Sequence, residues 1–141
     1  MSNIIKLDCQ FTDVEEEFLQ ETLKRMKFYA DKDEHFLSSH FSQKKQPCDA
    51  LIRCAMTGRA IGLGIVFGQP KVVQGVVTRN MKIIGEVFDG EYVSSTDFMN
   101  RFTQEYNCVK IIRSVSELGF TVDVEETLHN GQKRLVVSRV A

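Results

Sequence analysis

Residues 94–119 read SSTDFMNRFTQEYNCVKIIRSVSELG, and this stretch predicts a long helix. Its start offers a capping box, because Ser94 can accept a hydrogen bond from a free backbone amide and Asp97 follows three positions later. Ser95 or Thr96 is an alternative cap. Its end is marked by Gly119, since glycine readily adopts the left-handed conformation found just past a helix. Apolar residues recur at three- and four-residue steps, namely Phe98, Phe102, Val109, Ile112, Val115 and Leu118. Such a stripe needs a sheet or another helix to cover it.

Strands dominate the rest of the chain. Apolar and polar residues alternate over 5–11, which predicts a half-buried strand, and Thr12 with Glu15 predicts a capped helix directly after it. The pair Asn130-Gly131 lies between two apolar runs and predicts a hairpin near the carboxyl end. Further strands are predicted at 27–30, 50–56, 60–67, 71–78, 81–88, 121–128 and 133–140, with short turns at 57–59, 68–70 and 79–80.

The order strand, helix, several strands, helix, two strands predicts a single α+β domain over residues 1–141. We expect an antiparallel sheet, made of a central meander and the carboxy-terminal hairpin, with two helices packed on one face. Residues 31–49 predict a long loop, which is uncommon in a compact domain. No apolar run approaches the roughly 18 residues of a membrane span, and the first residues lack a signal-peptide pattern. We therefore expect a cytoplasmic protein with reduced cysteines and no membrane partner.

The net charge of −1 conceals an uneven distribution along the chain. Residues 39–85 hold seven basic residues against one acidic residue, whereas residues 1–38 and 86–141 are both net acidic. The basic middle third could attract a phosphate-bearing ligand, or it could face the acidic thirds of the same chain or of a second subunit. Nucleic acid is not the expected partner, because the whole chain is nearly neutral and carries no known motif.

Glycines leave one face of the strand predicted at 60–67 almost bare. Gly62 and Gly64 point to that face, while the apolar residues between them point to the other. The glycines could allow tight internal contacts or bending of the sheet. Alternatively they could allow a ligand to approach, and Arg53 and Arg59 would then be natural anion contacts.

Neither a metal site nor a catalytic site is identified by motif. His35, His40, Cys48 and Cys54 lie within twenty residues, but their spacing fits no familiar zinc motif. No nucleophile elbow is present, and paired carboxylates cannot be recognised from sequence spacing alone. We therefore expect no cofactor and find no positive support for an enzyme.

The segment FMNRFTQEY at 98–106 resembles a plastid and cyanobacterial family of unknown function, the hypothetical chloroplast reading frame thirty-five family. Its members carry a segment similar to F-L-N-R-L-T-Q-R-Y at the start of their last long helix. The likeness covers the carboxy-terminal third to two fifths of the chain, with a similar helix end at 118–120 and a similar strand at 134–137. It implies an α+β fold and no known reaction. The matching positions of the segment are Asn100, Arg101, Thr103, Gln104 and Tyr106.

Three functions remain open from the sequence. The first is a non-enzymatic protein that senses or sequesters a small anionic, nucleotide-like ligand. The second is a protein interaction module or homo-oligomer, in which basic and acidic thirds meet across subunits. The third is an enzyme acting on a phosphorylated substrate. For the first, Arg53, Arg59, Arg79 and Lys82 would hold phosphates, Asn100, Arg101 and Gln104 would read polar edges, and Tyr106 could stack on a ring.

Overall fold

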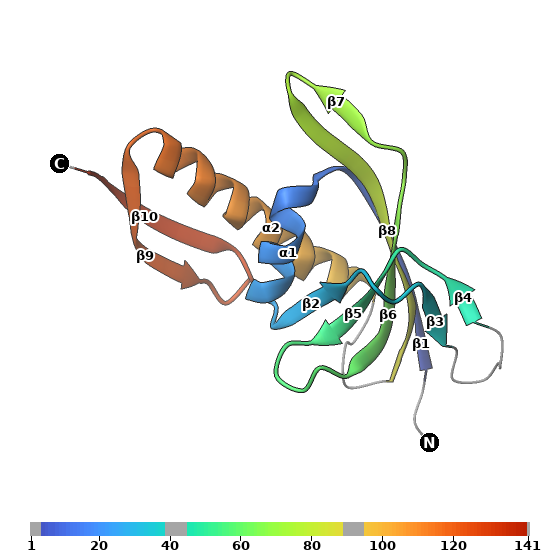
Figure 1. Ribbon diagram of the computed structural model, residues 1–141. Helices are drawn as coiled ribbons and strands as arrows, with labels where there is room; N and C mark the ends of the chain where they lie inside the picture. Colours follow the sequence, from blue (N-terminus) through green and yellow to red (C-terminus); the bar gives the residue numbers. More distant parts are fainter. Residues whose placement is uncertain (1–3, 39–44, 89–94, 141) are drawn as a thin grey trace.

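The computed structural model describes residues 4–38, 45–88 and 95–140, and it confirms the predicted α+β fold (Figure 1). The helices are α1 (Glu16–Arg25) and α2 (Ser95–Glu117). The strands are β1 (Ile4–Glu15), β2 (Phe28–Asp31), β3 (Phe36–Ser38), β4 (Lys45–Pro47), β5 (Ala50–Cys54), β6 (Ala60–Phe67), β7 (Lys71–Val73), β8 (Val76–Phe88), β9 (Phe120–Thr127) and β10 (Lys133–Arg139).

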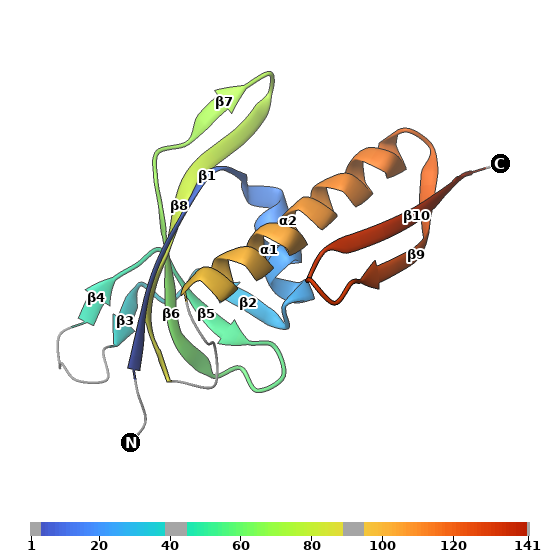
Figure 2. The ribbon, with the colours of Figure 1, turned by 180° about the vertical axis from the view of Figure 1, so that it is seen from behind.

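The main sheet is antiparallel, with the strand order β1-β8-β6-β5-β2, and β7 pairs with the beginning of β8. The predicted carboxy-terminal hairpin is present, but β9 and β10 form a two-stranded sheet of their own. Figures 1 and 2 show the main sheet curving around α1 and the first half of α2. The second half of α2 extends past the sheet, and the β9–β10 hairpin lies along it.

The core lies between the concave face of the sheet and the two helices. The strands contribute the side chains of one face of the sheet to this core, because alternate side chains of a strand point to the same face. The helices contribute apolar residues at helical spacing, and two rings of α2 are fully buried. The buried residues of this core are Cys9, Val14, Leu19, Leu23, Met26, Ala30, Ala50, Ile52, Leu63, Ile65, Met81, Ile83, Phe98 and Phe102.

The glycines of β6 serve internal contacts. A methyl group on Gly64 would lie 3.0 Å from the Cβ of Cys48, which packs on the outer face of the sheet with Leu37 and Leu51. Gly85 of β8 has a φ of +144°, and a Cβ there would lie 2.0 Å from the carbonyl oxygen of Gly62. Of the two interpretations that the sequence left open, the structure therefore supports close packing at these positions.

The helix cap predicted at Thr12 is wrong, because β1 continues through that position to Glu15. Val14 pairs with Arg79 of β8 and its side chain is buried, so pairing with the sheet outweighs the local capping signal. Asp13, with a φ of 53°, accommodates the break in register that precedes Val14. Helix α1 consequently begins at Glu16 without a side-chain cap. The cap predicted for α2 at Ser94 lies outside the described residues, and the alternative caps Ser95 and Thr96 lie within the helix itself.

The turn predicted at residues 79–80 is also wrong, since β8 runs through it as one strand. The turn lies instead at Gln74-Gly75, where φ is positive at both residues, as a two-residue hairpin turn of type I′ requires. Asn80 remains in the sheet, and its carbonyl oxygen accepts a hydrogen bond from the Gly68 amide at 2.8 Å. Pairing of β8 with β1 keeps the chain extended there.

Residues 31–49 are not the loop without secondary structure that the sequence predicts. They contain the short antiparallel pair β3–β4, while residues 39–44 lie outside the described part of the chain. The pair is fixed by burial of Leu37 and Cys48 against the outer face of the sheet. Three-residue strands with a Lys and a Pro carry little strand signal, which explains the incorrect prediction.

The contact between Gly85 and Gly62 predicts a large effect of a single methyl group. Gly85→Ala combines an unfavourable φ with a clash against backbone, so we expect a loss of about 3 kcal/mol or more in the free energy of unfolding. Gly75→Ala is the matched control, because its φ is also positive but nothing lies within 4 Å of the added Cβ. It should lose only about 1 kcal/mol. Urea unfolding measures both, and equal losses would contradict the account.

Candidate functional site

One side of α2 faces the β9–β10 hairpin along the pocket and carries all three of its carboxamide side chains. Residues separated by three, four or seven positions share a side of a helix, so this side can be read directly from the sequence numbers. It begins one turn before the hairpin tip and continues along the hairpin. Its members are Asn100, Arg101, Gln104, Asn107, Cys108 and Ile111.

A pocket of about 370 Å³ lies between this side of α2 and the hairpin. Its walls are partly apolar, but three carboxamides and one ammonium group also line it. Carboxamides present a donor and an acceptor side by side, which suits them to planar polar ligands. The lining residues are Gln104, Asn107, Cys108 and Ile111 from α2, and Gln132, Lys133 and Leu135 from the hairpin.

The hairpin turn positions Gln104 at the end of this pocket. Gly131 has a φ of 86°, and a Cβ on it would lie 3.1 Å from Oε1 of Gln104. The turn is closed by hydrogen bonds from the Leu128 amide to the Gln132 carbonyl and from the Gly131 amide to the Leu128 carbonyl, both at 2.8 Å. The predicted Asn-Gly turn therefore lets the hairpin approach α2 closely at the pocket.

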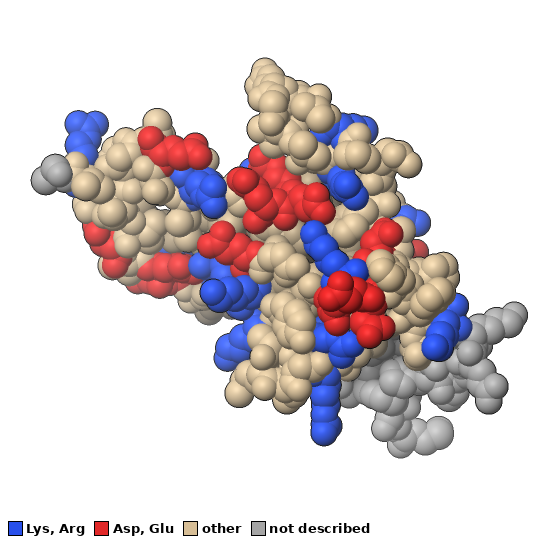
Figure 3. Space-filling view, viewed as in Figure 1, with Lys and Arg blue, Asp and Glu red and all other residues tan. Residues whose placement is uncertain are grey.

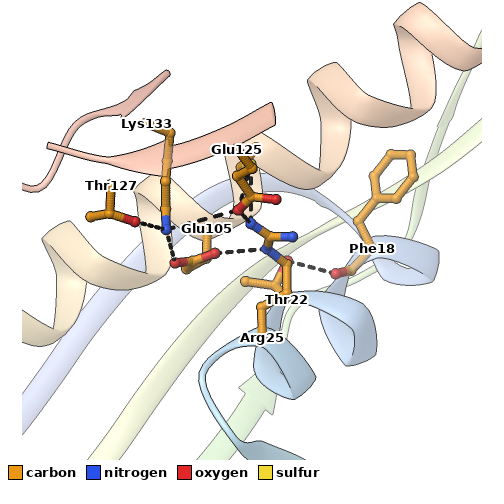
Figure 4. A network of polar contacts seen from close by, with 8 residues as sticks. Phe18, Thr22, Arg25, Glu105, Glu125, Thr127 and Lys133 are labelled. Atoms are coloured by element: carbon orange, nitrogen blue, oxygen red, sulfur yellow. Dashed lines mark hydrogen bonds and ion pairs between the residues drawn. The ribbon is translucent and has the colours of Figure 1, made fainter. Parts of the chain in front are cut away.

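An ionic network fastens the hairpin to the two helices (Figure 4). Glu105 of α2 accepts hydrogen bonds from Nε of Arg25 at 2.7 Å and pairs with Nζ of Lys133 at 2.9 Å. Arg25 also pairs with Glu125 of β9, and Lys133 donates to Thr127 at 2.6 Å. Two cations and two carboxylates thus balance one another where α1, α2, β9 and β10 meet (Figure 4).

The network shifts the pKa values of the groups it contains. Burial alone would raise the pKa of the Glu105 carboxyl, but hydrogen bonds from Lys133 and Arg25 outweigh this effect, and the pKa lies below its usual range. Burial raises the pKa of the Cys108 thiol, whose sulfur lies 3.2 Å from Nη2 of Arg25. Glu105 is therefore a bound carboxylate near neutral pH, and Cys108 remains a thiol.

Tyr106 lies on another side of α2 and belongs to the core. Its hydroxyl oxygen accepts a hydrogen bond from the Glu15 amide at 2.7 Å, and its ring lies near those of Phe18 and Phe102. Burial raises the pKa of its hydroxyl. Tyr106 thus fixes α2 to the end of β1, and its ring does not line the pocket.

Two arginines of the basic middle third face acidic residues of the first third. Arg53 pairs with Asp31 at 2.8 Å and with Glu34 at 3.7 Å. Arg79 lies 3.9 Å from Glu16 and 5.5 Å from the centre of a phenylalanine ring. At these positions the charges complement each other within one chain. Figure 3 shows acidic and basic side chains interspersed on the face it presents.

Arg59 and Lys82 are exposed, and neither makes an ion pair with the part of the chain that the structure describes. Lys82 alternates with the buried Met81 and Ile83, so it points to the face of the sheet away from the helices. The structure therefore does not bring the predicted cations of the meander to the pocket. Of the predicted site residues, only Gln104 lines the pocket, and Asn100 and Arg101 lie about one helical turn before it on the same side of α2.

Sequence reasoning missed the hairpin half of this pocket. Asn107 follows Gln104 by three positions, so the helical period alone could have added it to the predicted set. Gln132 and Lys133 were recognisable as neighbours of a turn, but no local signal indicates which helix the turn approaches. Their place in the site depends on tertiary packing against α2.

The histidines and cysteines considered for zinc are not assembled. The described residues contain no group of three His, Cys, Asp or Glu side chains suited to a metal, and His40 lies outside them. The Cys48 amide donates to the His35 carbonyl oxygen at 2.9 Å, while the Cys48 side chain packs over Gly64. Among the same residues, no helix has the length and apolar character needed to cross a membrane.

No protein-family model, curated protein sequence or solved structure matches this chain. The resemblance of residues 98–106 to the plastid and cyanobacterial family therefore stays a prediction. The site must be interpreted from its own geometry, because a fold class alone does not determine function.

The network predicts a specific dependence of stability on pH. Because the pKa of Glu105 is lowered by folding from 4.5, its contribution is present above that pH and is lost as the pH falls through the lower folded value. We expect Glu105→Gln to cost about 2 kcal/mol of unfolding free energy near neutral pH, and the difference from wild type to shrink in acid.

Glu126→Gln is the matched control, because Glu126 forms an exposed pair with Arg134 at 3.8 Å and should contribute little. Urea unfolding of the three proteins over a series of pH values gives the comparison. A Glu105→Gln difference that is constant from neutral to acid pH would contradict the assignment.

Proposed function

We propose that this protein is a non-enzymatic binding protein that senses or sequesters a small anionic, nucleotide-like ligand between α2 and the β9–β10 hairpin. One observation carries the proposal: three carboxamides and apolar walls line a pocket of about 370 Å³, with an arginine one helical turn away. The volume falls within the range of about 300–1,000 Å³ that is usual for small-molecule sites.

The carboxamides are suited to the ring of such a ligand. Gln104, Asn107 and Gln132 can each donate and accept hydrogen bonds, and an amide can bind the edge of a nucleobase through both groups. Ile111 and Leu135 offer apolar contact to the ring faces. A planar heterocycle is therefore the ligand class that fits both kinds of wall.

Arg101 is the cation available to the anionic part of the ligand. It is exposed, it forms no ion pair with a described residue, and it lies about 5 Å along the helix from Gln104. Lys133 is less suited, because Glu105 and Glu125 already balance its charge. An arginine can bind a phosphate through two parallel hydrogen bonds, so the ring would enter the pocket and the phosphate would remain at its mouth.

The state of the pocket residues favours binding over catalysis. Burial raises the pKa of the Cys108 thiol, which makes it a poor nucleophile. The nearby Glu105 carboxylate is held by two cations and is not free to act as a base. An enzyme acting on a phosphorylated substrate would need an activated group at this position.

A protein interaction module is the second candidate function. The exposed valines of β7 and β8 favour it, because contiguous exposed apolar side chains commonly mark contact surfaces. This function needs no ligand in the pocket and uses a different part of the molecule.

Isothermal calorimetry with nucleoside mono-, di- and triphosphates tests the first function. We expect saturable binding of at least one nucleotide. Arg101→Ala should weaken binding about tenfold, which corresponds to about 1.4 kcal/mol. Gln104→Ala should change the order of preference among the bases, because it removes a group that reads their edges.

Lys82→Ala is the control, since it removes an exposed cation on the opposite face of the sheet and should leave binding unchanged. Absence of saturable heat for every nucleotide at millimolar concentration would contradict the proposal. An equal loss of affinity in Lys82→Ala and Arg101→Ala would also contradict it, because the ligand would then bind at the basic residues of the central strands and not at the pocket.

A further inference from the structure

Residues 71–78 form a two-stranded arm that projects from the main sheet (Figures 1 and 2). Val72 lies opposite Val77 and Val73 lies opposite Val76, so each face of the arm carries one pair of valines. Val72 and Val77 are 69% and 43% exposed, and Val73 and Val76 are 61% and 41% exposed. The protein therefore presents an apolar arm to solvent on both of its faces.

An arm of this kind is not stable on its own account. Isolated two-stranded ribbons are marginal in water, and additional strands or a covering layer are needed to stabilise them. Figure 3 shows no acidic or basic side chain at the tip of the arm on the face presented. The outer edge of β7 pairs with no other described strand. Unpaired backbone and exposed valines thus occur at the same place.

Each edge strand of the main sheet carries a feature that opposes pairing with another chain. At the edge strand β2, the Gln20 carboxamide donates to the Ala30 carbonyl oxygen at 3.0 Å and accepts from the Ala30 amide at 3.1 Å. At the carboxyl end of the edge strand β1, Asp13 lies in a bulge and the Tyr106 hydroxyl occupies the Glu15 amide. Side-chain bonds and bulges of this kind prevent edge-to-edge association.

The other short sheets are protected by charge. Pairing of β9 with its own copy about Val124 would place Asp123 opposite Glu125. Pairing of β10 with its own copy about Val136 would place Lys133 opposite Arg139. Like charges directly opposite each other are destabilising, so neither strand is suited to self-association.

The β7 strand has no bulge and no side chain bonded to its outer edge among the described residues. Antiparallel pairing of two copies about Val72 would place Lys71 of each copy opposite Val73 of the other, with no like charges facing. In a hairpin with a two-residue turn, Val73 and Val76 form the hydrogen-bonded pair next to the turn, so the amide and carbonyl of Val72 point to the outer edge. A two-fold axis at Val72 would let these groups bond reciprocally.

We infer that the arm is a self-association site, at which β7 pairs with β7 of a second copy of this chain. The occupant is a second copy because antiparallel pairing about Val72 places no like charges opposite each other and lets the two Val72 residues bond reciprocally. The product is a four-stranded sheet, β8-β7-β7-β8, whose two faces each carry valines from both copies. Because the strand is three residues long, the interface is small and the dimer dissociates on dilution.

Sedimentation velocity over a range of concentrations tests this inference. The wild-type mass should rise from that of one copy, 16.1 kDa, toward twice that value. The rise should persist in high salt, since apolar contact and backbone bonds hold the dimer. Val72→Lys places two ammonium groups at the axis and should remain a monomer. Val136→Lys is the matched control on another half-exposed strand and should dimerise like wild type.

Disulfide cross-linking gives a second readout that does not depend on the stability of the lysine variants. The background carries Cys54→Ser, because Cys54 is the cysteine that is not buried. In this background Val72→Cys should form a covalent dimer on mild oxidation, because opposed residues of paired strands lie within about 5.5 Å at Cβ. Val136→Cys should not cross-link. A wild-type protein that stays monomeric, with no excess cross-linking at position 72, would overturn the inference. So would a dimer that Val72→Lys leaves intact, or a monomer that binds lipid vesicles through Val72.

Discussion

Burial of Phe98 and Phe102 against the sheet is the interaction on which the remaining structure depends. Their side chains are 0% and 1% exposed, and the Phe102 ring lies 4.6 Å from that of Phe11 between centroids. Fully burying such rings contributes roughly 1.5–3 kcal/mol each. Once they are in place, the axis of α2 is fixed, and the bond from the Glu15 amide to Tyr106 holds that axis against the end of β1. The second half of α2 must then extend beyond the sheet (Figure 1).

The two halves of α2 therefore belong to regions of different character. The first half completes the core, whereas from Gln104 onward the helix also supports a hairpin whose outer valines are partly exposed. A two-stranded hairpin needs further support, and here the network of Arg25, Glu105 and Lys133 supplies it. Because the pocket lies between α2 and this hairpin, the shape of the pocket depends on how firmly the network holds.

Local signals predicted the elements but not their partners. The helix ending near Gly119 and the hairpin at Asn130-Gly131 were predictable because each is defined by residues close in sequence. The continuous strand through Asn80 was not, since its pairing with β1 depends on residues about seventy positions away. The site also combines local and tertiary features. Helical spacing alone predicts that Arg101 and Gln104 lie together. Only the folded chain shows that Arg53 faces Asp31 and that the hairpin covers α2. Charge counts cannot distinguish a cation with an internal partner from a free one.

Native-state hydrogen exchange, resolved by residue, tests most directly whether the β9–β10 hairpin and the core are regions of different stability. Amides of β6, of residues 81–85 of β8 and of the first half of α2 should exchange only through global unfolding, because they belong to the buried core. Amides of β9 and β10 should exchange faster, through a local opening that separates the hairpin from α2 while the core stays folded. Equal protection of the hairpin and the core would contradict the account, since it would show that the two halves of α2 unfold as one cooperative unit.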